Sequence, residues 1–519
     1  MKTYTTLIAA LLLISSCGLE NYQESELTLE SENVLVEEVQ DNFNTEEYDR
    51  IYENEFLEVL KNPLSTFSID VDAASYSNTR RFISQGQLPP KDAVRIEEFI
   101  NYFTYNYEEP QGEHPFSIYT EISNCPWNSK NKLLHIGLQG RRVQTENIPS
   151  NNLVFLLDVS GSMDDPNKLP LLKSSFHLLV EQLGENDRIA IVVYAGEAGV
   201  VLPSTPCNNK EQIMQAINDL QAGGSTAGGQ GILLAYKIAE ENFIKEGNNR
   251  IILATDGDFN VGVSSDAELV RLIEMKRETG IYLSVLGFGT GNYKDSKMEK
   301  LADHGNGNFY YIDNIFEAKK VLVNEMGGTL LTIAKDVKIQ IEFNPAKVYQ
   351  YRLIGYENRL LRNEDFEDDT KDAGELGAGH SVTALYEIVT KEDDQDNSKA
   401  VNYKYQSTNI STDAYSSTEI ATLKFRYKNP NDTSSNLIEH SILDQNIDIN
   451  NSSIDFKFAS SVAEFGLLLR DSKFKGSSTY DHVMEMATIS KGSDIEGYRA
   501  EFIKIVKAAK DIDEKQKKQ

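Results

Sequence analysis

Five oxygen-bearing side chains, in three separate segments, have the types and spacing that bind a small hard cation. Three are hydroxyls and two are carboxylates, and no His or Cys is among them. Such oxygens favour Mg²⁺, which keeps several waters and near-octahedral geometry, with Mn²⁺ or Ca²⁺ as alternatives. The candidate metal ligands are Asp158, Ser160, Ser162, Thr226 and Asp256.

The surrounding residues predict elements that would bring these side chains together. An uninterrupted apolar run at 153–157 is typical of a strand buried on both faces, and a second strand pattern covers 250–256. Gly161 lets the chain turn, and Pro170 opens a helix predicted over 171–183. If the two strands are neighbours in a parallel sheet, their carboxyl ends share the edge at which such folds bind ligands.

Thr226 lies in the glycine-rich stretch 222–231, before a helix predicted over 232–243. A phosphate loop is the alternative, but the stretch lacks Lys and the Gly-Lys-Ser/Thr ending, so we expect no nucleotide there. A lone Asp-x-Ser-x-Ser is often a solvated turn or a helix cap. Three pieces in this order, two of them directly after buried-type strands, favour the metal site.

These pieces resemble the metal-ion-dependent adhesion site of von Willebrand factor type A (VWA) domains. In that family two serines and a threonine coordinate the metal, and two aspartates act mostly through water. The resemblance therefore implies direct ligation by Ser160, Ser162 and Thr226, with Asp158 and Asp256 one water away.

The resemblance extends over roughly residues 60–515 to the bacterial YfbK-type VWA lipoproteins, which carry companion segments before and after the VWA domain. It rests on the segments 67–78, 88–98 and 254–262. We expect five regions: a lipoprotein signal peptide at 1–16, a lipidated Cys and acidic tether at 17–62, a VWA-associated region at 63–150, the VWA domain at 151–335, and a C-terminal domain at 336–519.

Alternating strand patterns lie on both sides of the VWA segment, in 115–143 and in 336–430. Because a pair of strands cannot stand alone in water, the two sets should join in one sandwich. The predicted fold class is α/β: a doubly wound, mostly parallel VWA (Rossmann-like) sheet inserted in an antiparallel β-sandwich, with additional helical segments. Both connections of the VWA domain should lie at the end opposite the metal.

The amino-terminal residues resemble a bacterial lipoprotein signal. Lys2 precedes an apolar run at 7–14 that is too short to span a bilayer, and 14–17 resembles a lipobox. This implies lipid attachment to Cys17, although a cleaved signal with an incidental cysteine is the alternative. Gly18 stands where some bacteria use Asp for inner-membrane retention, which favours the outer membrane of the cell envelope, on a side left open.

Charge excludes several classes of partner. The chain has 51 basic and 80 acidic residues, a net charge of −29, which argues against nucleic acid and against electrostatic capture by anionic lipid. Residues 18–62 hold fourteen acidic residues and two basic ones, as expected of an extended tether, with a short docked helix conceivable over 48–60. A tether carboxylate capping the metal is a less favoured alternative.

Other residues have competing interpretations. Asp70 and Asp72 could pair on a metal, but helix capping is favoured. Tyrosines at 102, 105 and 107, like Trp127, are expected in the core, and Cys125 and Cys207 as free thiols. On the rim of the metal site, Asp258 and Phe259 are candidates for partner contact, with loop core as the alternative for Phe259.

The remaining patterns predict regular elements inside the VWA segment and fewer beyond it. In the VWA segment the strands are expected at 188–194, 198–203, 281–288 and 308–313, and the helices at 210–220, 266–279, 297–302 and 315–326. Beyond it, long loops are expected at 391–416 and 428–455, helices at 456–469 and 493–510, and a frayed end at 511–519.

The leading hypothesis is a non-enzymatic, envelope-anchored binding protein whose metal accepts a Glu or Asp from a protein partner. The only membrane contact expected is the lipid anchor. A metal-assisted hydrolase is a weaker rival, because the chain lacks His-Glu-x-x-His and Gly-x-Ser-x-Gly and has no His near any site segment. A structural protein whose metal site is filled internally is the third alternative.

Overall fold

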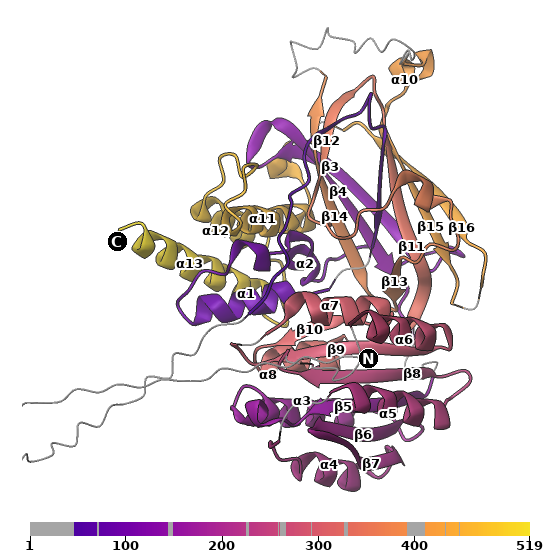
Figure 1. Cartoon of the computed structure of the whole chain (residues 1–519). Coiled ribbons are helices and arrows are strands. Elements are labelled where there is room, and N and C mark those ends of the chain that lie inside the picture. The colour runs from indigo at the N-terminus through magenta and orange to yellow at the C-terminus, as the bar shows by residue number, and fades with distance from the viewer. Residues whose placement is uncertain are drawn as a thin grey trace, which may run out of the picture. The chain divides into compact units, whose positions relative to one another are not determined.

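A computed structural model describes most of the chain from residue 46 onward (Figure 1). The described residues are 46–69, 72–143, 149–224, 228–257, 259, 266–291, 293–325, 331–391, 410–430, 432–445 and 447–518. Within them, no helix is both long and apolar enough to cross a membrane. The signal-like segment and Cys17 lie outside the described residues.

The VWA segment forms a six-stranded sheet in the order β10-β9-β8-β5-β6-β7, parallel except for the β6–β7 pair. Its strands are β5 (Asn151–Asp158), β6 (Arg188–Ala195), β7 (Glu197–Pro206), β8 (Asn248–Thr255), β9 (Ile281–Phe288) and β10 (Phe309–Ile312). Its helices are η3 (Gly161–Asp164), α3 (Leu169–Gln182), α4 (Lys210–Asn218), α5 (Gly228–Glu241), α6 (Asp266–Glu278), α7 (Asp295–His304), α8 (Ile315–Lys319) and η4 (Lys320–Asn324).

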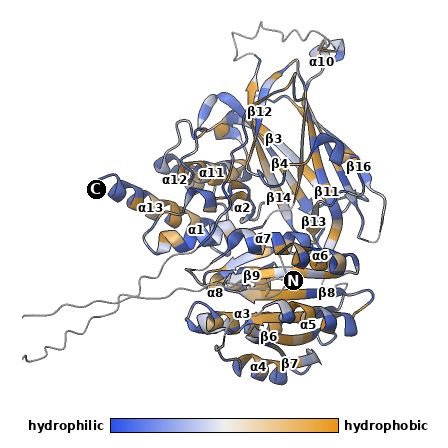
Figure 2. Ribbon diagram, viewed as in Figure 1, coloured by the Kyte–Doolittle hydropathy of each residue, from blue (hydrophilic) through white to orange (hydrophobic). Residues whose placement is uncertain are grey.

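Helices cover both faces of this sheet, as the apolar strand pattern predicts. On one face, Phe155 of β5 packs in a core with α3, α4 and α8; on the other, Val154 and Leu156 pack with α5, α6 and α7. Figure 2 shows hydrophobic colour along β8 and β9, with mixed colours on the surrounding helices. The doubly wound fold is confirmed, and β5 and β8 are neighbours as expected.

Two antiparallel sheets form the predicted sandwich, with the orders β1-β12-β14-β4-β3 and β13-β11-β15-β16, and β2 also pairs with β11. Strand β4, from before the VWA domain, pairs with β14, from after it. The strands are β1 (Leu57–Glu58), β2 (Leu64–Ser68), β3 (Phe116–Cys125), β4 (Asn128–Gly140), β11 (Thr332–Phe343), β12 (Val348–Ile354), β13 (Gly374–Gly377), β14 (Ser381–Thr390), β15 (Glu419–Lys428) and β16 (Asn436–Leu443). The VWA domain is therefore an insertion in the sandwich.

Both connections of the VWA domain lie at the amino ends of the parallel strands. The chain enters at Asn151, the first residue of β5, whereas Asp158 is at its other end. It leaves through Thr332, which lines the same cavity as Arg250, near the amino end of β8. The sandwich thus holds the VWA domain at the end opposite the candidate metal site.

A helical region flanks the sandwich. Helix α11 packs against α2 and α12, and α13 packs against α1 and α12. Rings of Phe103, Phe458 and Phe502 contact one another edge to face in its core. The remaining helices are α1 (Ala74–Ser84), η1 (Lys91–Ala93), α2 (Ile96–Asn101), η5 (Asn363–Phe366), α10 (Thr412–Ser416), η6 (Ile449–Asn451), α11 (Ile454–Leu469), α12 (Tyr480–Ile489) and α13 (Tyr498–Gln516).

Several local predictions were wrong. Residues 48–60 are extended rather than helical, because β1 pairs with the edge strand β12. The loop expected over 428–455 contains β16, and the end expected to fray continues α13 to Gln516. Helix α12 was not predicted.

The buried aromatic and thiol predictions were correct. Tyr102, Tyr105, Tyr107 and Trp127 are all buried. The two described cysteines are free and buried, and they are Cys125 and Cys207. Burial raises the pKa of both thiols, which keeps them protonated at neutral pH.

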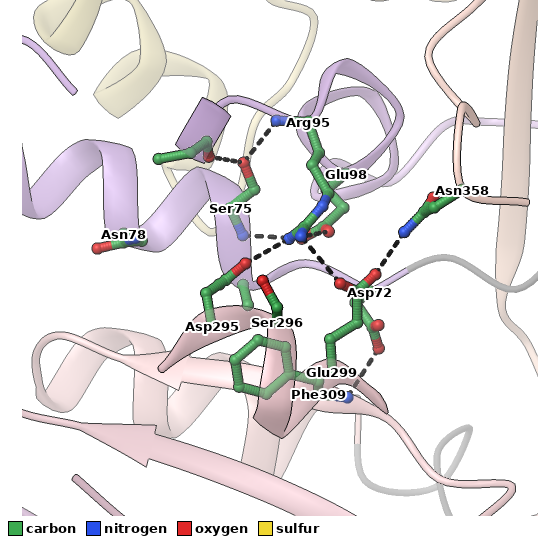
Figure 3. A network of polar contacts seen from close by, with 12 residues as sticks. Asp72, Ser75, Asn78, Arg95, Glu98, Asp295, Ser296, Glu299, Phe309 and Asn358 are labelled. Carbon is green, nitrogen blue, oxygen red and sulfur yellow. Dashed lines mark hydrogen bonds and ion pairs between the residues drawn. The ribbon is translucent and has the colours of Figure 1, made fainter. Parts of the chain in front are cut away.

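An acidic stripe on α7 receives arginines from the companion regions, and Figure 3 shows the part of it around Arg95. Asp295, Glu299 and Asp303 are four residues apart and share one helix face. The buried guanidinium of Arg95 lies 2.6 Å from Asp295 and 2.9 Å from Glu299. Arg359 pairs with Asp303 and, at 3.1 Å, with Glu299. Buried ion pairs thus join α7 both to the segment before α2 and to the sandwich.

Asp72 belongs to this network rather than to a helix cap or a metal pair. The first helix begins after Ala73, and the Asp72 carboxylate accepts a hydrogen bond from the Phe309 backbone N–H at 2.7 Å. It also lies 3.3 Å from Arg359. The capping interpretation was therefore wrong, since a charged partner from the sandwich takes the carboxylate. Asp70 lies outside the described residues.

A second clamp holds the closing helix of the VWA domain. The buried guanidinium of Arg80, on α1, lies 2.5 Å from Asp313 and 2.6 Å from Glu317 of α8. The Tyr102 hydroxyl donates to the same Glu317 at 2.8 Å. The companion region therefore fixes the position of α8 through charge as well as packing.

Replacing Arg95 by Met should lower the free energy of unfolding by about 3–5 kcal/mol, because the buried carboxylates of Glu98, Asp295 and Glu299 would lose the cation that they share. Lys91→Met is the matched control: its ion pair with Asp471 is exposed and should contribute about 0–1 kcal/mol. Urea unfolding followed by circular dichroism measures both. Equal losses in the two variants would show that the buried network does not hold the domains together.

Candidate metal site

Three adjacent strands end at the candidate site. In the order β8-β5-β6, their carboxyl ends bear Thr255 and Asp256, Asp158, and Tyr194. The parallel register pairs Asp158 with Tyr194 and Leu157 with Ala254. Because the strands are parallel and in register, polar residues from distant parts of the chain reach one edge of the sheet.

Asp158 is fully buried, and its carboxylate is held by hydrogen bonds from three neighbours. It accepts from the Ser160 backbone N–H at 2.9 Å, and from the Tyr194 and Thr255 hydroxyls at 3.3 Å each. Burial nevertheless raises the pKa of Asp158 to about 6, and the nearby charge of Asp256 adds to the rise. The site therefore favours a cation beside this carboxylate.

The two serines lie side by side but differ in their exposure to solvent. The hydroxyl oxygens of Ser160 and Ser162 are 3.1 Å apart, Ser160 is buried and Ser162 faces solvent. Their turn is held by the glycine-rich loop, since the Gly161 N–H donates to the Gly224 carbonyl at 3.1 Å. Thr226 lies outside the described residues, two positions beyond this contact, so its predicted ligation stays a prediction.

The side chain of Lys168, the residue before α3, reaches into the site. The sequence pattern did not single out this residue. Its ammonium donates to Asp256 Oδ2 at 3.0 Å and to the Ser162 carbonyl at 2.9 Å. Its stem passes over Gly289, where a Cβ would overlap the lysine side chain. Lys168 is 5% exposed, so the charge lies within the protein.

The loop that supports Lys168 is itself bound by the start of the described chain. Glu46 accepts from the Gly291 N–H at 3.0 Å, and the Glu47 N–H donates to the Tyr293 carbonyl at 3.1 Å. The Glu46 carboxylate also binds Arg81 at 2.8 Å, on α1. The Glu46 carboxylate is therefore paired with Arg81 and Gly291, and a metal cap formed by another tether carboxylate stays an untested alternative.

Phe259 is not a rim residue. It is 1% exposed, packs edge to face on Tyr194 with ring centroids 5.4 Å apart, and lies against Gly228, where a Cβ would be 2.6 Å from the ring. The absence of a side chain at Gly228 leaves room for the ring inside the domain. The rim prediction was wrong for Phe259, and Asp258 lies outside the described residues.

The donor set suits a hard divalent cation. Two buried carboxylates lie beneath a pair of hydroxyls that opens to solvent, and all of these ligand atoms are oxygens. Among the described residues, no group of three or more His, Cys, Asp or Glu has the arrangement of a metal site. Asp158, Ser160, Ser162 and Asp256 are gathered as predicted, and their role as ligands stays a prediction.

Three family models match consecutive parts of the chain. The model described as von Willebrand factor type A domain matches residues 152–324, which contain the six-stranded sheet. The model described as von Willebrand factor matches residues 42–135. The model described as Uncharacterized protein YfbK, C-terminal matches residues 328–512. Together they cover the VWA domain and both companion regions.

Three known proteins are similar to parts of the chain or to most of it. The YfbK protein of Escherichia coli (strain K12) is 43% identical over 90% of this chain and 82% of its own length. The sll0103 protein of Synechocystis is 31% identical over 32% of this chain and 39% of its own length. A solved VWA structure from Catenulispora acidiphila covers 76% of this chain and 89% of its own, at 17% identity and a TM-score of 0.42.

The relative from Escherichia coli is matched along most of its length, including the companion segments on both sides of the VWA domain. VWA domains are generally non-catalytic interaction modules. On this evidence the chain belongs to the YfbK family of VWA-domain proteins.

Proposed function

We propose that this protein is an envelope-anchored binding protein that captures a partner carboxylate through Mg²⁺ at the edge of its VWA sheet. The observation that carries the proposal is the gathering of Asp158, Asp256, Ser160 and Ser162 at neighbouring strand ends, buried below and open to solvent above. Two carboxylates without solvent call for a cation, and the exposed hydroxyl side gives a ligand access to it.

Ser160, Ser162 and Thr226 would hold the ion directly, and the two aspartates through water. Neutral ligands leave the ion with most of its charge, which it offers as a Lewis acid to an incoming oxygen. The chain's own part is to fix the hydroxyls, which it does through the Gly161–Gly224 hydrogen bond and the Asp158 bond to the Ser160 N–H. Mn²⁺ and Ca²⁺ are the alternative ions.

The ligand would be a Glu or Asp side chain of a protein partner. The loops around the site would select among carboxylates, and Asp258 remains the candidate rim residue. The lipid anchor would be Cys17, attached to the outer membrane. The tether would then meet the folded region at Glu46, beside the loop 289–294 that supports Lys168.

Two other functions would use the same residues. A structural protein could fill the metal site from within the chain and use it only for stability. A hydrolase would need a base beside the ion, and the groups that contact Asp158 are hydroxyls and a backbone N–H. We favour the binding protein because the hydroxyl pair opens to solvent.

The double substitution Ser160→Ala and Ser162→Ala should abolish the rise in melting temperature that Mg²⁺ gives to the wild-type protein, because both direct hydroxyl ligands are lost. Isothermal titration with Mg²⁺ should show at least a tenfold weaker dissociation constant, about 1.4 kcal/mol. Ser174→Ala, on the exposed side of α3, is the control and should behave like wild type.

Capture of envelope proteins with and without EDTA separates the binding role from the structural one. The binding role predicts that the double variant loses Mg²⁺-dependent partners while its melting temperature in EDTA stays near that of wild type. A large drop in that temperature, with no partner lost, would favour the structural protein instead.

Replacing Asp158 by Asn should raise the free energy of unfolding in EDTA at pH 7 by on the order of 2–3 kcal/mol. Burial raises the pKa of Asp158, so ionising its carboxylate at pH 7 costs free energy that the neutral amide avoids. The folded pKa of Asp158, about 6, is above its ordinary value of 3.8. The wild-type free energy of unfolding should therefore fall, relative to the variant, as pH rises from about 4 to about 6.

Urea unfolding of both proteins across this pH range, in EDTA, measures the difference. Mg²⁺ should then raise the melting temperature of the wild type and leave the Asn variant unchanged. A variant that is less stable than wild type in EDTA at pH 7 would contradict the view that Asp158 needs a cation.

A further inference from the structure

The ammonium of Lys168 is part of the candidate metal site rather than of its surroundings. It lies 3.0 Å from Asp256 Oδ2 and 2.9 Å from the carbonyl of Ser162, so it touches one predicted water-mediated ligand and the backbone of a direct one. Because this buried cation contacts both Asp256 and the serine turn, its charge is part of the net charge of the site.

Lys168 is held in this place by the fold. It stands just before α3, and its backbone N–H donates to the Asp165 carbonyl at 2.9 Å. Its methylene stem lies on Gly289, whose φ of +76° and missing Cβ leave the space that the stem fills. The Tyr311 hydroxyl donates to the Gly289 carbonyl at 2.6 Å, which fixes the position of the glycine under the lysine stem. The charge is therefore fixed relative to Asp256.

The charges of the buried groups decide what the loaded site attracts. Asp158 and Asp256 are each 0% exposed, and Lys168 is 5% exposed, so none is well screened by solvent. A divalent ion together with two aspartates alone would be neutral. With Lys168 included, the loaded site carries one net positive charge. Asp165, 3.8 Å from the ammonium, is 68% exposed and so counts for little.

We propose that Lys168 makes this metal site selective for an anionic ligand. It lowers the affinity of the site for the divalent ion and raises the affinity of the loaded site for a carboxylate. The inference rests on the proposed metal-dependent function and adds its specificity-determining residue. One excess positive charge matches one carboxylate, whereas a neutral ligand such as an amide or a hydroxyl would leave the charge uncompensated in a poorly solvated place.

The proposal requires two effects of opposite sign. Removing the ammonium removes a repulsion against the divalent ion, so the metal should bind more tightly. The same change removes an attraction for the incoming carboxylate, so that ligand should bind more weakly. A merely structural lysine would shift both affinities in the same direction, because loss of the site's geometry harms both.

The test uses Mn²⁺ as a spectroscopic probe and acetate as the carboxylate. Electron paramagnetic resonance of free Mn²⁺ gives the metal affinity of the purified protein, and water-proton relaxation follows acetate as it displaces water from the bound ion. The variants are Lys168→Met, Lys168→Gln, whose amide can still donate to Asp256, and the charge-retaining Lys168→Arg. Lys173→Met is the control, because its ammonium donates to the backbone carbonyls of Asn218 and Leu220 rather than to a group of the candidate site.

Both neutral variants should bind Mn²⁺ at least about tenfold more tightly and, once loaded, acetate at least about tenfold more weakly than wild type. Lys173→Met should stay within about threefold of wild type in both measurements. Lys168→Arg, which keeps the charge, should bind Mn²⁺ more weakly and acetate more tightly than the two neutral variants do. Melting curves identify a variant that fails to fold. If Lys168→Met does not fold, Lys168→Gln still tests the effect of removing the charge.

The possible failures are distinguishable. A wild-type protein that binds no Mn²⁺ would overturn the metal site and the proposed function with it. A wild type that binds Mn²⁺, with neutral variants whose metal affinity is unchanged or weaker, or whose acetate affinity is unchanged, would overturn the role of Lys168 alone.

Discussion

Two buried like charges at the ends of adjacent strands are the constraint on which the site depends. Asp158 and Asp256 lie where β5 and β8 leave the sheet, and both are without exposed surface. Carboxylates in such a place must be protonated or meet a cation. Three features fit this need to neutralise the carboxylates. They are the hydroxyls of Ser160 and Ser162, the Lys168 ammonium and the position of the glycine-rich loop.

The same principle holds the VWA domain to the rest of the chain. Acidic residues on α7 and α8 face arginines from the segments before and after the domain, above all Arg95, Arg359 and Arg80. A displacement of α7 or α8 would have to break several buried ion pairs, so the site is built on a rigid support rather than on a free domain.

Sequence patterns predicted the parts of the fold that depend on local periodicity. The apolar run before Asp158 showed a strand buried on both faces, and the spacing of the serines located the site. Lys168 was missed because its role depends on Gly289, far along the chain, and no local pattern links them. The spacing of Asp295, Glu299 and Asp303 could have indicated a charged helix face, but not its arginines. Phe259 follows no periodicity, so its burial required the position of Gly228.

The central claim is that oxygens from separate segments hold a divalent ion at this edge of the sheet. Anomalous X-ray scattering from crystals grown with Mn²⁺ tests it most directly. The account predicts one strong peak at direct coordination distance from the hydroxyls of Ser160, Ser162 and Thr226, with Asp158 and Asp256 one water away. No peak at this edge, or a peak bound by other residues, would contradict it.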